Sequence, residues 1–216
     1  AIGSGLALCL AMRAAGKRAY FVCEDVPPEK FFFIPAMKEV LTSLPEEEYD
    51  LFITVDCAEV TRTGSLSQTY LRFRGETVNI DHHISNTCYA HCNCVLGCSA
   101  TCEIMPEVLQ AAGLEITKDV AQLLMLGLMT DSGVFTHNDV TPHTFGVAAL
   151  LREKGADVTE INYRMFSSQK KERAMLFRRA LEKLRFALDD RLAFIPVSEK
   201  DIAETVSYTH LTLPTT

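Results

Sequence analysis

The sequence has no long apolar run and no excess of positive charge. No stretch approaches the roughly 20 uncharged apolar residues that a membrane span needs. The longest apolar run near the start, residues 6–12, lacks the basic residues that precede the apolar core of a signal peptide. The formal net charge of -7 argues against unspecific binding to DNA or to acidic membranes. We therefore expect no association with a membrane.

Internal repeats and low-complexity segments are also absent. Hydrophobic residues make up 48% and charged residues 23% of the 216 residues, which is the balance of a globular chain that can bury a core. The eight cysteines come without a secretory signal, so reduced thiols are the expected state. These features together predict a globular, cytoplasmic protein.

Both ends predict an incomplete chain. Residue 1 is alanine, and the next residues lead straight into a helical pattern, as if a strand–turn–helix unit had been cut. Residues 207–216 break the preceding pattern and are similar to a translated sequencing adapter, so we expect this tail to be non-native.

Strand-like and helix-like patterns alternate along the chain. Apolar strands are predicted at residues 18–23, 50–56 and 76–81, and helices at residues 3–15, 31–44, 99–112, 118–130, 142–154 and 167–184. This alternation predicts an α/β fold, with a parallel sheet covered by helices on both faces. The pattern at residues 191–197 predicts the first strand of a second domain. We therefore place the first domain at residues 1–184 and the start of a truncated second domain at 185–206.

Acidic and imidazole side chains follow the predicted strands. Asp56 ends one strand, Asp81 ends the next and is followed directly by His82 and His83, and Asp131 ends a predicted helix. Ligands bind at the carboxyl ends of parallel strands, and Mn²⁺, Fe²⁺ or Zn²⁺ selects carboxylates with imidazoles. A single Asp after a strand is more often a turn or capping residue. From the pattern alone, a metal site and a structural role both stay open.

Three motifs carry a resemblance to a known family. The segments VDC at 55–57, IDHHISN at 80–86 and TDSG at 130–133 resemble, in this order, the DHH phosphoesterase family. Within it, the chain is most similar to the branch of bifunctional oligoribonucleases and PAP phosphatases. The start, AIGSG at 1–5, resembles the end of the family's first motif. The resemblance implies that the rest of this motif and the glycine-rich C-terminal DHHA1 domain are missing.

The resemblance also implies a role for each matching residue. Asp56 would bridge two metal ions, and His82 and Asp131 would be metal ligands of the second ion. His83 would be catalytic and would face the substrate phosphate, where its N–H can stabilise developing charge. Asp81 would support catalysis by orienting the histidines. The implied cofactors are two Mn²⁺ ions, with Mg²⁺ or Co²⁺ as alternatives.

The implied substrates are phosphoesters. Ser4, at the start of the first helix, would bind a substrate phosphate together with His83. The implied activity is hydrolysis of short oligoribonucleotides to 5′-mononucleotides and of 3′-phosphoadenosine 5′-phosphate to AMP. Without the first motif, we expect this chain to be an inactive fragment. The alternatives are a non-catalytic metal- or nucleotide-binding protein and a sister activity on pyrophosphate, polyphosphate or cyclic dinucleotides. A homodimer is possible.

Two further clusters have competing interpretations. Five cysteines with His91 among them could bind zinc, although their spacing matches neither a zinc ribbon nor a finger: Cys88, Cys92, Cys94, Cys98 and Cys102. The resemblance instead makes this segment a loop, a strand and a helix start. The basic stretch at 170–185 is either a solvated helix face or a wall that attracts a nucleic-acid backbone.

Overall fold

The computed structural model describes residues 1–168 and 171–201, with only the backbone for residues 172 and 173. The chain forms two compact units, Ala1–Met165 and Phe166–Thr216. The expected domain boundary at 184 stays a prediction, although the unit boundary falls earlier in the chain. The expected adapter tail and the rest of 202–216 lie outside the described residues.

A three-stranded parallel sheet lies at the centre of the first unit. Its strands are ordered β1-β2-β3, with bounds Leu51–Val55, Glu76–Asp81 and Cys92–Val95. Val55 pairs with Ile80, and Asp81 pairs with Val95. Because the strands are parallel and in this register, their carboxyl ends meet at one edge of the sheet.

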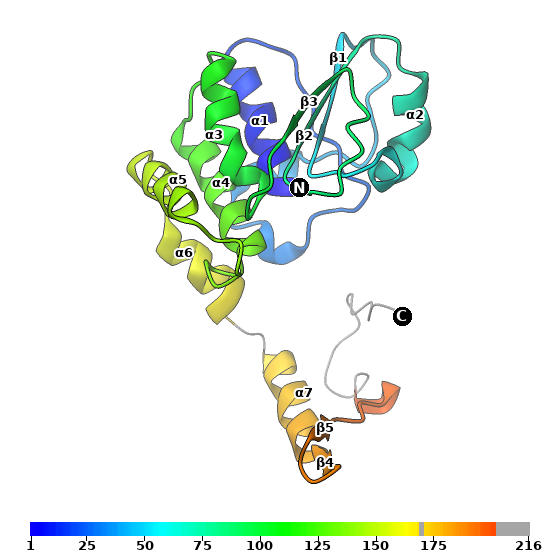
Figure 1. The fold of residues 1–216 in the computed structure, drawn as a ribbon, viewed down its shortest axis with the longest axis vertical. Coiled ribbons are helices and arrows are strands. Elements are labelled where there is room, and N and C mark those ends of the chain that lie inside the picture. Colours follow the sequence, from blue (N-terminus) through cyan, green and yellow to red (C-terminus); the bar gives the residue numbers. More distant parts are fainter. Residues whose placement is uncertain (169–170, 202–216) are drawn as a thin grey trace. The chain divides into compact units, whose positions relative to one another are not determined.

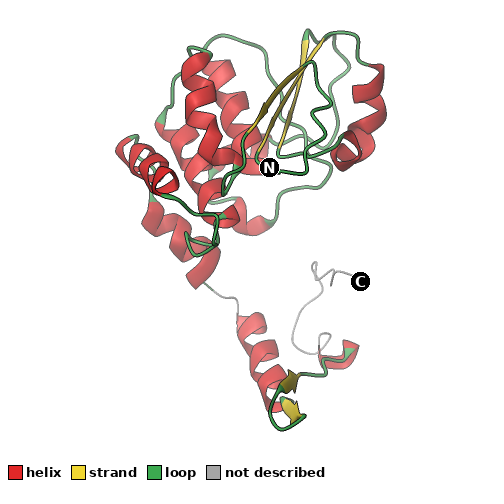
Figure 2. Ribbon diagram, in the orientation of Figure 1, coloured by secondary structure: helices red, strands yellow, loops and turns green. Residues whose placement is uncertain are grey.

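Helices cover this sheet on both sides, which confirms the predicted α/β fold. In Figure 1, α1, α3 and α4 lie on one side of the strands and α2 lies on the other. Their bounds are Ile2–Ala14, Thr101–Ala111, Lys118–Asp131 and Ser67–Arg72, and the unit also contains α5 at Pro142–Glu153 and α6 at Val158–Asn162 (Figure 2). In the part of the chain that the structure describes, no helix is both long and apolar enough to cross a membrane.

The core of this unit is a tight packing of α1, α3 and α4. Leu6, Leu123 and Leu128 are completely buried in it. Two glycines allow the helices to approach closely. A Cβ atom on Gly3 would lie 2.7 Å from the Leu123 carbonyl oxygen, and one on Gly127 would lie 2.2 Å from Cys102 Sγ. These distances are shorter than van der Waals contact, so any larger residue would push the helices apart.

Two predicted elements are wrong. Residues 18–23 do not form a strand, because among the described residues Val22 makes only an isolated bridge to Leu41. The helix predicted at 31–44 is replaced by two short 3₁₀ turns, Glu29–Phe31 and Pro35–Glu39. Pro35 explains this break, because proline disfavours the helical conformation of the residue before it, and Ile34 is indeed extended.

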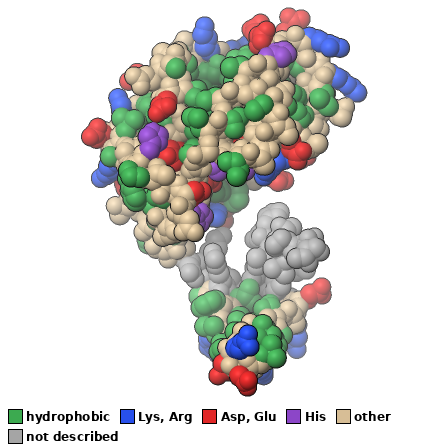
Figure 3. Space-filling model, in the orientation of Figure 1, with side chains coloured by type: hydrophobic (Ala, Val, Ile, Leu, Met, Phe, Trp, Pro, Cys, Tyr) green, Lys and Arg blue, Asp and Glu red, His purple; other side chains and the backbone are tan. Residues whose placement is uncertain are grey.

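The described part of the second unit contains one long helix, one hairpin and the helical residues 199–201. Helix α7 spans Lys171–Glu182, and β4 (Arg185–Ala187) pairs antiparallel with β5 (Leu192–Phe194). The strand predicted at 191–197 is therefore present but shorter, and it is the second strand of the hairpin. Figure 3 shows apolar side chains on the surface of this unit. They include Phe177 and Leu188, which are both exposed.

Candidate metal centre

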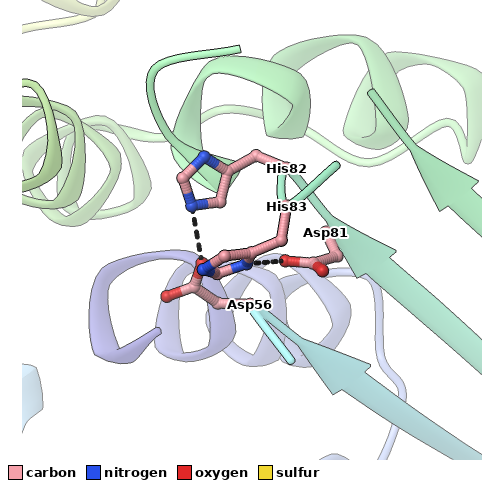
Figure 4. Close-up of side chains that lie close together, drawn as sticks. All are labelled: Asp56, Asp81, His82 and His83. Carbon is pink, nitrogen blue, oxygen red and sulfur yellow. Dashed lines mark hydrogen bonds and ion pairs between the residues drawn. The ribbon is translucent and has the colours of Figure 1, made fainter. Parts of the chain in front are cut away.

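Four side chains converge at the carboxyl edge of the sheet. Asp56 follows β1, Asp81 ends β2, and His82 and His83 come next in the chain. Each offers one ligand atom, and these atoms all lie within 4.8 Å of one another. Figure 4 shows the two imidazole rings reaching towards the two carboxylates. The structure therefore brings together four of the residues that the sequence singled out.

Asp56 stands at a sharp turn of the backbone. Its φ of 59° is in the left-handed region, which few residues other than glycine, asparagine and aspartate adopt. Its Oδ1 accepts a hydrogen bond from Thr101 Oγ1 (2.8 Å), and its Oδ2 accepts one from the Ala1 ammonium (2.5 Å). Burial alone would raise the pKa of Asp56, but hydrogen bonds from His82, the ammonium and Thr101 hold it well below its usual range. The side chain is thus an ionised acceptor.

His82 is held at both ring nitrogens. Its Nδ1 lies 2.9 Å from the Cys98 carbonyl oxygen, and its Nε2 lies 3.3 Å from Asp56 Oδ1. A carbonyl oxygen only accepts, so Nδ1 must carry the hydrogen. The hydrogen bond to Asp56 raises the pKa of His82 to about 9, although burial opposes this. When the ring is neutral, the lone pair is on Nε2 and faces Asp56.

His83 is oriented by Asp81. Its Nδ1 lies 2.7 Å from Asp81 Oδ1, and Asn86 Nδ2 donates to Asp81 Oδ2 (2.6 Å). Asp81 is completely buried. Burial would raise its pKa, but the hydrogen bonds from His83 and Asn86 lower it below its usual range. The ionised Asp81 therefore accepts from His83 Nδ1–H and leaves the Nε2 of this partly exposed ring available.

The buried side chain of Asn79 connects the two loops that carry these site residues. Asn79 donates through Nδ2 to Thr54 Oγ1 (3.0 Å), to the Cys57 carbonyl (3.2 Å) and to the Tyr89 hydroxyl (3.1 Å), and its Oδ1 accepts from Asn86 (2.8 Å). Asn79 is completely buried, so these bonds are not exposed to water. The network fixes the loop after β1 relative to the loop after β2.

The structure does not bring the other two predicted site residues into this cluster. Asp131, the last residue of α4, lies outside the four-residue group. Its charge still acts on Asp56 and His82, and burial raises its own pKa. The Ser4 side chain is completely buried, and its hydroxyl donates to the Ala1 carbonyl (3.0 Å). A phosphate-binding role for Ser4 stays a prediction.

The chemistry of the cluster fits a divalent cation. Atoms that share a zinc or manganese ion lie about 2 Å from it and hence about 4 Å or less apart, so a group within 4.8 Å needs only small adjustments. The cysteine-rich segment makes no comparable group. Among residues 1–168 and 171–201, only Asp56, Asp81, His82 and His83 form a group whose ligand atoms lie within 4.8 Å of one another.

Three contributions to the site were missed at the level of sequence. They are the Thr101 hydroxyl on Asp56, the Cys98 carbonyl on His82 and the Asn86 amide on Asp81. Asn86 lies inside the IDHHISN motif, so its position gave a signal for a role. The other two follow β3 in the chain, and no short-range pattern indicates them.

Comparisons with known proteins identify a family. Residues 1–128 match the model of the DHH family, N-terminal domain. The chain is 32% identical over 169 residues to the bifunctional oligoribonuclease and PAP phosphatase NrnA of Thermus thermophilus, which covers 76% of this chain and 49% of that protein. It is 28% identical over 153 residues to the A-adding tRNA nucleotidyltransferase of Geobacter sulfurreducens, covering 70% of this chain and 16% of that protein. The chain thus spans at most about half the length of these relatives.

Solved structures show the same fold. An exopolyphosphatase-related protein from Bacteroides fragilis superposes with a TM-score of 0.86 at 22% identity, covering 95% of this chain and 64% of that one. A putative family II inorganic pyrophosphatase from Methanococcus jannaschii gives a TM-score of 0.54 at 19% identity, covering 76% of this chain and 56% of that one. The family model matches more than half of the residues of this chain, so the chain belongs to the DHH family.

Proposed function

We propose that this protein is a Mn²⁺-dependent phosphoesterase that hydrolyses short oligoribonucleotides to 5′-mononucleotides and 3′-phosphoadenosine 5′-phosphate to AMP. The observation that carries the proposal is the convergence of Asp56, Asp81, His82 and His83 at the carboxyl edge of the sheet. The choice of substrate follows the similarity to the Thermus NrnA protein. The free thiols of all eight cysteines fit the cytoplasm as its compartment.

Each site residue has its own role in the proposed reaction. Asp56, His82 Nε2 and Asp131 would hold metal, with Asp56 shared between two ions. When bound, such ions polarise the phosphoryl oxygens and lower the pKa of water. In its doubly protonated form, His83 would present its Nε2–H to the substrate phosphate, where a positioned N–H stabilises the charge that develops on phosphorus-bound oxygen. Asp81 keeps this ring in place through its bond to Nδ1.

A metal titration of the 216-residue chain tests the site. Asp56→Asn should weaken Mn²⁺ binding by about a hundredfold or more, because a neutral amide replaces a charged ligand. The matched control is Asp50→Asn, at the other end of the same strand and exposed to solvent. Free Mn²⁺ is measured by electron paramagnetic resonance. Equal Mn²⁺ affinity in the two variants would contradict a metal centre at Asp56.

Substrate class is tested by equilibrium dialysis of the Mn²⁺-loaded chain. 3′-Phosphoadenosine 5′-phosphate should bind more tightly than pyrophosphate, and His83→Ala should weaken its binding about tenfold through loss of the phosphate contact. His91→Ala is the control, because His91 is exposed and paired only with the exposed Glu76 in the described residues. Tighter binding of pyrophosphate would favour the sister activity instead. Equal loss in both histidine variants would contradict the role of His83.

A further inference from the structure

A buried carboxylate outside the metal cluster has no role in the proposed reaction. Glu103, in the first turn of α3, is only 2% exposed. Its Oε2 accepts hydrogen bonds from Ser99 N–H (3.2 Å), Ser99 Oγ (2.6 Å) and Thr144 Oγ1 (3.1 Å). Its Oε1 lies 3.0 Å from His143 Nδ1. These hydrogen bonds stabilise the buried Glu103 carboxylate, and they also hold the donor residues in place.

The important donor is the Ser99 N–H. It belongs to the same peptide unit as the Cys98 carbonyl, which accepts the hydrogen bond from His82 Nδ1. A trans peptide is planar, with its C=O and N–H pointing in opposite directions. Glu103 therefore holds one side of this peptide while His82 binds the other. Rotation of the peptide would break both bonds together.

We propose that Glu103 is a positioning residue for His82. Its carboxylate fixes the Cys98–Ser99 peptide, the carbonyl of that peptide fixes His82 Nδ1–H, and the lone pair of Nε2 is thereby directed at Asp56. This inference rests on the proposed function, in which His82 is a metal ligand. Partners of ligating histidines are known to change metal affinity when they are removed. Here the histidine's partner is a backbone carbonyl, so its orientation is set by the side chain that holds its peptide.

Two substitutions of Glu103 test the proposal on the full chain. Glu103→Leu removes every acceptor and should lower Mn²⁺ affinity about tenfold, near the lower end of such effects. Glu103→Gln keeps one oxygen for the Ser99 N–H and should lose less affinity than Glu103→Leu does. The control is Glu107→Gln, one turn further along α3, where the exposed carboxylate contacts His143 but not Ser99. It should leave affinity unchanged.

A second readout follows the histidine itself. In the metal-free chain, nuclear magnetic resonance should show a protected His82 Nδ1–H proton, and Glu103→Leu should abolish this protection while Glu107→Gln preserves it. If Glu103→Leu fails to fold, Glu103→Gln gives a graded form of the test, because a neutral amide oxygen is a weaker acceptor for the Ser99 N–H than the carboxylate, and the protection should fall part of the way.

The outcomes separate this inference from the proposed function. A folded Glu103→Leu chain, or a Glu103→Gln chain where Glu103→Leu does not fold, with an unchanged His82 Nδ1–H signal would overturn the positioning role. That result would stand whether or not the chain binds Mn²⁺. A different result would separate the two claims. If Asp56→Asn does not weaken Mn²⁺ binding but Glu103→Leu still abolishes the protection of the His82 Nδ1–H proton, the proposed function fails and the positioning role survives.

Discussion

The helix core and the carboxyl edge of the sheet are built on different principles within one unit. In the core, α1, α3 and α4 meet through apolar side chains and two glycines, and shape complementarity determines the packing. At the edge, the buried Asp81 and Asn79 and the half-buried Asp56 are polar groups held by directed hydrogen bonds. The core therefore supplies most of the stability, since apolar burial is the main driving force. At the edge, polar side chains take the place of apolar ones, and their hydrogen bonds fix the direction of four ligand atoms.

Truncation in the core should give the largest loss of stability. Leu123 is completely buried in α4, so Leu123→Ala should lower the free energy of unfolding by about 2–5 kcal/mol. Leu71→Ala on α2 is the control, because this side chain is 61% exposed and should cost much less. Urea unfolding followed by circular dichroism measures both. Similar losses in the two variants would contradict the difference between core and surface.

Enlarging a core glycine sharpens the same comparison. Gly127→Ala should destabilise by about 1–3 kcal/mol, because the new Cβ would lie 2.2 Å from Cys102 Sγ. Gly146 also lies inside a helix, but a Cβ there meets nothing within 4 Å. Gly146→Ala should therefore stabilise the protein by about 0.5–1 kcal/mol. Thermal unfolding of both variants checks the opposite signs, and a loss of stability at both positions would argue against close packing at Gly127.

Acid should weaken the polar contacts by a smaller amount. Burial would raise the pKa of Glu103, but hydrogen bonds from Ser99, His143 and Thr144 hold it below its usual range. A depressed carboxyl pKa contributes stability above its unfolded value of about 4.3, and this contribution is lost as the pH falls through the folded pKa. Glu103→Gln should therefore unfold with less dependence on pH below about 4.3 than the unmodified chain does. Leu123→Ala should lower stability while keeping that dependence, and identical acid profiles for all three would contradict the role of Glu103.

The sequence predicted the features that depend on neighbouring residues. The strands that end in Asp56 and Asp81 are continuous apolar runs, so their positions and the meeting of their acids at one sheet edge followed from local pattern and from parallel topology. The same local reasoning failed at residues 18–23, because an apolar run forms a strand only where another strand pairs with it. It failed at 31–44 because the apolar spacing was given more weight than Pro35.

The links that cross the fold could not be read from the sequence. His82 contacts the Cys98 carbonyl, and Glu103 contacts Thr144 in α5, 41 positions later in the chain. Such contacts depend on the packing of whole elements. One part had a local signal: a serine followed by a glutamate in the first turn of a helix resembles a capping box. Here the spacing from Ser99 to Glu103 is one residue longer than in that motif.

Anomalous diffraction from a crystal of this chain grown with Mn²⁺ tests the central claim most directly. We predict a manganese peak within bonding distance of an Asp56 carboxylate oxygen and of His82 Nε2. This prediction would be contradicted if this position were empty while manganese occupied another site, such as the cysteine-rich segment 88–102.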